Sequence, residues 1–247
     1  MTISQPHPPI QLAAHVRACR VGNQMIFLDL LRSKYIGVGG PQIEALSNAI
    51  LGTARADGLE SRHSDNALLG RYVRRLRQEQ LLAAVPMLAS QSTSPILQNP
   101  AVGLTTDDDD DDDDDMQFEW RQLLRLWRST FIAGEWLRRR TLADIAERLD
   151  ALRAHQPADV DQASTATLHR LVTTYFRLRP FALSTHDKCL NDSLTLIHFL
   201  TTQGLAARWV IGVRTNPFGA HAWAQAGDIV LNDYPERVRH FEPILVV

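Results

Sequence analysis

Nine consecutive aspartates occupy residues 107–115 of this 247-residue chain. Adjacent carboxylates repel one another and have no apolar surface to bury, so no packed helix or strand can contain such a run. The residues before it, from position 86 onward, are rich in Pro, Ser, Gln and Thr, a composition that cannot offset the entropy of ordering. We therefore predict a disordered acidic linker over residues 86–117, with the run as a spacer between two folded parts.

The aspartate run also hides the charge of the folded parts. The chain has 28 acidic residues, nine of them in the run, which leaves 19 against 26 Lys and Arg. This mild basic excess suits an acidic or neutral peptide partner, and no arginine-rich recognition helix with interleaved aromatic residues indicates nucleic-acid binding. The run lacks the spaced ligands and turn glycine of a calcium loop. We expect no nucleic-acid partner and no metal site.

The two cysteines, Cys19 and Cys189, are far apart in the sequence, so neither a disulfide framework nor a metal-binding pair is indicated. This usage suits a reducing cytoplasm. No window approaches the roughly 18 apolar residues of a membrane span, and the N-terminus lacks the pattern of a signal peptide. We expect a cytoplasmic protein with no membrane partner, and a core-packing role for Cys19.

The N-terminal part has a strand-rich pattern. Residues 1–9 are predicted to be a disordered tail. Alternating and β-branched residues then predict three strands joined by tight turns, over residues 14–20, 25–31 and 33–38. Apolar residues at helical spacing follow, which predicts helices over residues 41–52 and 64–81. Residues 10–85 are therefore expected to form a small β-β-β-α-α module.

The C-terminal part, residues 118–247, mixes helices and strands. Helical patterns cover residues 118–127, 141–153 and 163–178. After them we predict a helix capped by Asp187 and ending at Gly204, a strand over residues 208–213, and a hairpin over residues 221–233. Two such parts in one chain give an α+β fold class.

Three residues in this part have the chemistry of a thiol hydrolase. Cys189 falls in the first turn of the predicted helix, where unpaired N–H groups and the helix dipole favour thiolate. His221 and Asp233 lie on the two hairpin strands, and a three-residue connection, residues 226–228, places them directly opposite each other. An even-length connection would move Asp233 to the other face of the hairpin.

The roles of these residues follow from their chemistry. Cys189 is the predicted nucleophile, His221 the general base and acid, and Asp233 the group that orients the imidazole. The backbone N–H of Cys189 is a predicted oxyanion donor. His186, close to Cys189 in sequence, is an alternative base, and Trp223 is expected to point into the core from the face opposite to His221.

Several blocks of this region resemble one known family. They are Cys189-Leu190-x-x-Ser193-Leu194, Ile211-Gly212-Val213-Arg214, Pro217-Phe218-x-Ala220-His221-Ala222-Trp223, Leu231-Asn232-Asp233 and Phe241-x-Pro243-Ile244-Leu245. They look like the lasso-peptide B proteins, which are transglutaminase-like leader peptidases of microcin maturation. The resemblance implies a papain/transglutaminase-like α+β domain over residues 118–247 and assigns the catalytic triad to Cys189, His221 and Asp233.

The resemblance also extends to residues 10–85, which are similar to the small winged-helix-like peptide-binding module called the RiPP recognition element. It implies that the leader of a precursor peptide adds as a strand to a sheet edge and packs on a helix. We expect the edge strand to come from residues 25–31 and the helix from residues 68–81.

The function predicted from these observations is that of a cysteine peptidase that binds a ribosomal precursor peptide and removes its leader in lasso-peptide biosynthesis. The resemblance implies a second partner, an asparagine-synthetase-like macrolactam synthetase. No Walker-type glycine loop occurs here, so we expect no cofactor in this chain and any ATP requirement to lie with that partner. Two alternatives remain, a transglutaminase-like acyltransferase or amidase and a non-catalytic precursor-binding scaffold.

Overall fold

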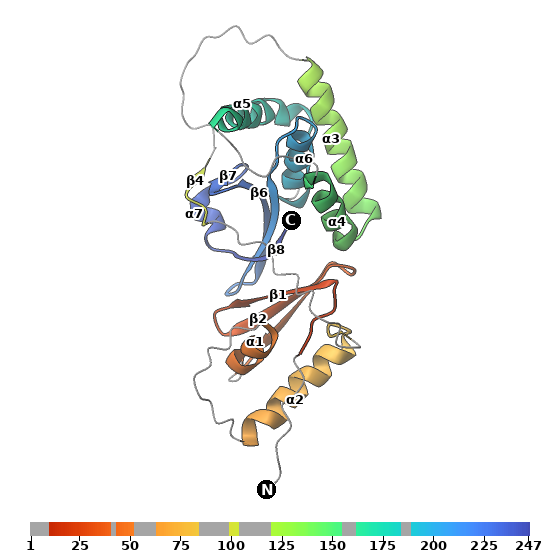
Figure 1. Ribbon diagram of the computed structural model, residues 1–247, viewed down its shortest axis with the longest axis vertical. Helices are drawn as coiled ribbons and strands as arrows, with labels where there is room; N and C mark the ends of the chain where they lie inside the picture. Colours follow the sequence, from red (N-terminus) through yellow and green to blue (C-terminus); the bar gives the residue numbers. More distant parts are fainter. Residues whose placement is uncertain are drawn as a thin grey trace. The chain divides into compact units, whose positions relative to one another are not determined.

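The computed structural model describes residues 10–40, 43–51, 63–83, 99–103, 120–154, 162–183 and 189–247 (Figure 1). The chain divides into two compact units, Met1–Thr93 and Ser94–Val247. Both contain helices and strands, so the predicted α+β class is confirmed. The predicted tail over residues 1–9 and the aspartate run lie outside the described residues.

The N-terminal unit has the predicted β-β-β-α-α order. Its elements are β1 (Val16–Val21), β2 (Gln24–Asp29), β3 (Lys34–Gly39), α1 (Ile43–Leu51) and α2 (His63–Gln78). The three strands are antiparallel in the order β1-β2-β3. Val21 pairs with Gln24, so Gly22 and Asn23 form the predicted turn, and Gly22 has the positive φ of 57° that such a turn favours.

The core of this unit forms where one face of the sheet meets the helices. Met25 and Phe27 are two residues apart and so share a face of β2, and they cluster with Ile43 and Leu46 of α1 and with Leu76 of α2. All three helical side chains are almost fully buried. Cys19 is also buried, as expected.

The edge strand, however, was predicted wrongly. Because β2 pairs with β1 on one side and β3 on the other, residues 25–29 lie in the central strand. The edges of this sheet are β1 and β3. Central strands are often buried on both faces and read as continuous apolar runs, and the Met-Ile-Phe-Leu run of β2 has this character.

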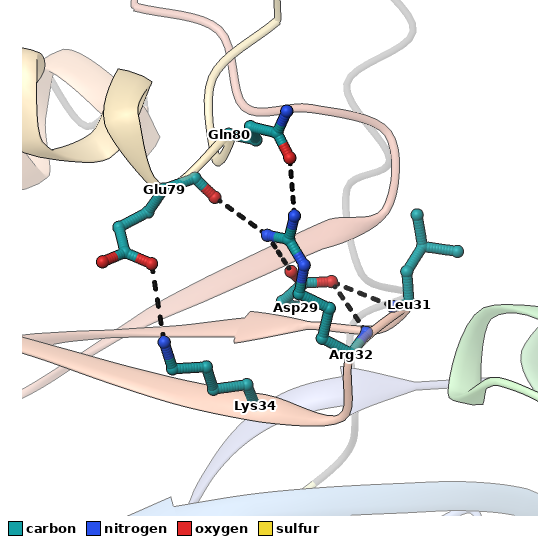
Figure 2. Close-up of polar contacts among 6 residues, drawn as sticks. All are labelled: Asp29, Leu31, Arg32, Lys34, Glu79 and Gln80. Carbon is teal, nitrogen blue, oxygen red and sulfur yellow. Dashed lines mark hydrogen bonds and ion pairs between the residues drawn. The ribbon is translucent and has the colours of Figure 1, made fainter.

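A buried carboxylate joins the sheet to the end of α2 (Figure 2). Asp29, 1% exposed, accepts hydrogen bonds from the backbone N–H groups of Leu31 and Arg32 at 3.0 and 3.1 Å. Arg32 in turn donates to Asp29, to the carbonyl of Glu79 and to the side chain of Gln80. One carboxylate therefore shapes the β2–β3 turn and holds the arginine that binds the C-terminal end of α2.

We predict that Asp29→Ala lowers the free energy of unfolding of the N-terminal unit by about 1–3 kcal/mol, because it removes the buried acceptor of two backbone N–H groups and of the Arg32 side chain. Lys34→Ala is the matched control, since its ion pair with Glu79 is exposed on both sides and such pairs contribute at most about 1 kcal/mol. The hydrogen–deuterium exchange rates of the β2 and β3 amides measure the local stability of both variants. Equal exchange in the two variants would contradict the role given to Asp29.

The C-terminal unit places helices on a mainly antiparallel sheet. In chain order the helices are α3 (Trp120–Arg139), α4 (Leu142–Arg153), α5 (Gln162–Leu178), the 3-10 turn η1 (Arg179–Phe181), α6 (Cys189–Thr201) and α7 (Pro235–Val238). The described strands are β4 (Val102–Gly103), β5 (Arg208–Arg214), β6 (Gly219–Ala226), β7 (Ile229–Val230) and β8 (Glu242–Val246). They form one sheet in the order β4-β7-β6-β5-β8.

Helix α6 is the centre of this unit. Nine consecutive residues, Asp192 to Leu200, are buried, which is expected only of a helix covered on all sides. It packs against α3 on one side and against β5 and β6 on the other (Figure 1). The position of its first residue is therefore set by the whole unit.

Residues 99–103 lie inside the predicted linker, but Val102 and Gly103 are a strand of this sheet and Pro100 and Ala101 are hydrogen-bonded to the same unit, so the linker prediction is wrong there. Val102 and Gly103 pair in parallel with β7, and Arg239 donates two hydrogen bonds to the carbonyl of Pro100, at 2.9 and 2.7 Å. Gly103 lies so close to Pro235 that a Cβ there would be 2.7 Å from the ring. A two-residue strand paired to a remote partner has no periodicity that the sequence could reveal.

Helix α3 is also longer than predicted. It continues from residue 127 to Arg139, and its buried residues are Gln122, Leu126, Ser129 and Ala133. Four of its large apolar side chains instead form an exposed stripe: Trp120, Leu124, Trp127 and Phe131. None of the helices that the structure describes has the length and apolar character needed to cross a bilayer.

Candidate active site

Cys189 is the first residue of α6, as predicted. Its carbonyl accepts a hydrogen bond from the Ser193 hydroxyl at 2.7 Å, and the indole N–H of the buried Trp209 donates to that hydroxyl at 2.9 Å. Strand β5 thus anchors the first turn of α6 through one serine. Cys189 as a whole is half-buried.

The other two predicted residues lie next to this thiol. His221 is on β6, which packs against α6, and Asp233 lies between β7 and α7. His221 Nε2 is hydrogen-bonded to Asp233 Oδ2, and the Cys189 thiol is hydrogen-bonded to His221. The predicted proximity of the three residues is therefore confirmed. Since Asp233 occupies Nε2, Nδ1 is the ring nitrogen left for the thiol.

The predicted hairpin register is wrong, although the pair forms. Gln225 pairs with Val230 and Ala226 with Ile229, so the connection has two residues instead of three. In this register a regular strand would place Asp233 opposite Ala222, on the face away from His221. The strand instead ends early: the last ladder bond runs from Leu231 N–H to the Ala224 carbonyl, and residues 231–233 bend away. Because Asp233 is no longer in a strand, its side chain does not follow the alternating side-chain directions of a strand, and it can reach His221.

The electrostatics favour an ion pair at the site. Burial alone would lower the pKa of His221, but hydrogen bonds to Asp233 and Cys189 outweigh it and raise that pKa to about 9. Burial would raise the pKa of the Cys189 thiol, yet the hydrogen bond from His221 and the N–H groups of Ala222 and Leu190 lower it. Both shifts favour the thiolate–imidazolium pair over the neutral pair.

Asp233 is held as a carboxylate. It is 7% exposed, and burial would raise its pKa, but the hydrogen bond from His221 and one from the Tyr234 N–H lower it. Arg237 adds a positive charge 3.7 Å away. A permanently charged acceptor keeps the imidazole protonated on Nε2, which fixes its orientation.

Two aromatic rings flank the imidazole. The Phe241 ring centre lies 5.3 Å from that of His221, and Trp223 stacks at 6.1 Å. Trp223 is buried as expected but shares the face of His221, because residues two apart on a strand point to the same side. Gly212, opposite His221 in the ladder, leaves room for both side chains: a Cβ there would be 2.8 Å from the Trp223 ring and 2.8 Å from Phe241 Cβ.

Some predictions cannot be compared with the structure. Asp187, the predicted helix cap, and His186, the alternative base, lie outside the described residues. The backbone N–H of Cys189 remains a predicted oxyanion donor. Among the residues that the structure does describe, no group of three or more His, Cys, Asp or Glu is arranged to hold a metal ion.

Two sequence comparisons relate this chain to known proteins. The family model described as Transglutaminase-like superfamily matches residues 132–246, a range that contains all three site residues. The C-terminal unit therefore carries a transglutaminase-like domain.

One curated relative is the Microcin J25-processing protein McjB of Escherichia coli, 45% identical over 47 residues. These residues are 19% of this chain and 23% of that protein, so the chain covers less than a quarter of its relative. Together the two matches support a protein that resembles the lasso-peptide B proteins. No solved structure matches the chain significantly.

We predict that Cys189 reacts with iodoacetamide as a thiolate with a pH midpoint below the ordinary thiol pKa of 9.0. In His221→Ala the hydrogen bond and the positive charge are lost while burial remains, so the midpoint of the pH–rate curve should rise above that of the wild type. Mass spectrometry of the alkylated peptides gives the rate. Unchanged midpoints would show that His221 does not activate the thiol.

We also predict that Gly212→Ala displaces Trp223 or Phe241 and costs about 1–3 kcal/mol of stability, as overpacked cores do. The shift should also raise the pH midpoint of Cys189 alkylation, since both rings flank His221. Gly134→Ala in α3 is the matched control, because a Cβ there meets nothing within 4 Å. Thermal unfolding and alkylation rates test both variants, and a wild-type profile for Gly212→Ala would argue against the tight packing.

Proposed function

We propose that this chain is a cysteine peptidase that binds a ribosomally made precursor peptide and removes its leader during lasso-peptide biosynthesis. The observation that carries the proposal is the contact of Cys189, His221 and Asp233, with a half-buried thiol whose pKa is lowered beside an imidazole whose pKa is raised. A thiol, a base and an orienting carboxylate are the parts that covalent peptide hydrolysis needs.

The first half of the reaction makes an acyl-enzyme. The Cys189 thiolate attacks the carbonyl carbon at the end of the leader, and a C–S bond forms. As the tetrahedral intermediate collapses, the C–N bond breaks and imidazolium His221 gives its proton to the leaving amine. That amine is the new N-terminus of the core peptide.

The second half returns the enzyme to its starting state. Neutral His221 takes a proton from water, and the resulting hydroxide attacks the thioester. The C–S bond breaks, and the leader leaves as a carboxylate. Asp233 remains charged throughout and stabilises the imidazolium whenever it forms, while Tyr234 N–H and Arg237 keep that carboxylate in place.

In this proposal the N-terminal unit is the precursor-binding module. An extended leader segment adds to an edge strand of its sheet, and β3 is the edge that we propose. Helix α2 and the residue that follows it contact both ends of β3: Tyr72 donates to the Gly39 carbonyl at 3.2 Å, and Glu79 pairs with Lys34 at 3.5 Å. A peptide on β3 would therefore lie beside α2, which offers side chains for specificity.

The product of cleavage defines the second proposed partner. A free core N-terminus is the nucleophile that a macrolactam synthetase needs to close a ring. An asparagine-synthetase-like enzyme would supply the ATP-dependent activation, and this chain would need no cofactor of its own. The support is the similarity to the microcin-processing relative.

An acyltransferase or amidase is the second candidate, favoured by the transglutaminase-like family match. It would use the same thioester with an amine in place of water. The two activities give products of different mass: hydrolysis leaves a leader carboxylate, whereas transfer leaves a leader amide.

We predict that Cys189→Ala abolishes cleavage of the precursor while leaving precursor binding unchanged, because only the nucleophile is removed. Mass spectrometry of the products and fluorescence anisotropy of a labelled precursor measure the two properties. Asp233→Asn should retain binding and lower kcat by several orders of magnitude, about 10⁴-fold where the imidazole is left in the wrong tautomer. Cleavage by Cys189→Ala at the wild-type rate would reject the proposed function.

A further inference from the structure

The bend that carries Asp233 to His221 contains a side chain that is hydrogen-bonded to two other elements, Asn232. In a regular antiparallel pair, Ala224 and Leu231 would exchange two backbone hydrogen bonds. Leu231 N–H does donate to the Ala224 carbonyl at 2.9 Å. The reciprocal donor, Ala224 N–H, instead donates to Oδ1 of Asn232 at 2.8 Å. The asparagine amide thus replaces a backbone carbonyl at the point where the chain leaves the sheet.

The other end of that amide is held by the nucleophile helix. Asn232 Nδ2 donates to Asp192 Oδ2 at 3.0 Å, and Asp192 is on α6, three residues after Cys189. One side chain therefore joins β6, which carries His221, to α6, which carries the thiol. It also directly precedes Asp233 in the chain.

The Asp192 carboxylate is itself fixed. It is 5% exposed, and its Oδ1 accepts from the Tyr175 hydroxyl at 2.8 Å and from Arg179 Nε at 2.9 Å. Tyr175 is fully buried on α5. A buried carboxylate with three donors on two oxygens has little freedom to move, so it is a firm anchor for Asn232.

We propose that Asn232 and Asp192 are positioning residues, whose hydrogen bond ends the β7 strand early and so places Asp233 against His221. This inference rests on the proposed function, because it assigns a purpose to the placement of the triad. Neither residue touches the reacting atoms. Without the Asn232 amide, Ala224 N–H would have to take the Leu231 carbonyl, and regular pairing would direct Asp233 to the wrong face.

The pair allows an exchange test. Asn232→Asp places two carboxylates against each other and should disrupt the bend. The double variant Asp192→Asn/Asn232→Asp restores a donor facing an acceptor: the new amide at 192 donates to the carboxylate at 232, whose other oxygen accepts from Ala224 N–H. The oxygen of that amide can still accept from Tyr175 and Arg179. Glu147→Gln, at an exposed position on α4, is the control.

Two readouts are needed in the full chain. The first is kcat/KM for precursor cleavage. The second is the pH midpoint of Cys189 alkylation by iodoacetamide, which requires no substrate and responds to the charged groups around His221, namely Asp233, Cys189 and Arg237. Thermal unfolding of each variant separates loss of folding from loss of placement.

We expect Asn232→Asp to lower kcat/KM by about tenfold to hundredfold, the range for a lost charged hydrogen bond, and to raise the alkylation midpoint. The double variant should recover most of both changes, and Glu147→Gln should match wild type. The inference is overturned if Asn232→Asp keeps the wild-type midpoint, or if the folded double variant is no better than the single one. A wild-type chain whose Cys189 reacts like an ordinary thiol would instead overturn the proposed function itself, and the inference with it.

Discussion

The hydrogen-bonded contact of His221 with Asp233 and Cys189 is the interaction around which the C-terminal unit is organised. Burial works against it, because a charged imidazole loses solvation inside a protein. The carboxylate on one side and the thiol on the other outweigh that loss and raise the pKa of His221 to about 9. Such a balance holds only while both partners stay at hydrogen-bond distance, so the site depends on the placement of three separate elements.

Each element is fixed by a different kind of packing. Cys189 is held because α6 is buried along nine consecutive residues and because Ser193 ties its carbonyl to Trp209. His221 is held by the β5–β6 ladder and by the rings of Trp223 and Phe241. Asp233 lies in a bend and has no ladder of its own. Its placement therefore has to come from side-chain and backbone hydrogen bonds around residues 232–234, which makes it the part of the site most sensitive to substitution.

The sequence was enough to find the three residues but not their geometry. Helical and alternating patterns located α6, β5 and β6 to within about two residues, because these elements bury long apolar runs. The hairpin connection was predicted one residue too long, and the alignment of His221 with Asp233 rested on that error. The pair forms because β7 has only two residues, and no periodicity reveals where so short a strand ends. The sequence does show two polar residues, Asn232 and Asp233, directly after an apolar run, at the position where the strand ends.

The other differences between the predicted and the observed elements also come from contacts that local sequence patterns do not reveal. The buried face of helix α3 combines Leu126 with Gln122, Ser129 and Ala133, whereas four of its large apolar residues are exposed, so a search for a large apolar stripe finds the wrong face. Strand β4 is too short to leave a pattern. Strand β2 was taken for an edge because each strand was read alone, whereas the order of strands in a sheet depends on which neighbours pair.

The exposure of the site fits its proposed chemistry. Asp233 and His221 are both less than 10% exposed, whereas Cys189 is only half-buried. The proton-handling pair is thus shielded from water, which strengthens its electrostatic interactions, and only the nucleophile faces a substrate. A carboxylate exposed to solvent would bind the imidazolium weakly, and a fully buried thiol could not reach a peptide bond. Because the aspartate must be buried without a strand to hold it, its support has to come from polar side chains that are buried as well. The carboxylate of Asp192, joined to Asn232 and to Tyr175, meets that requirement.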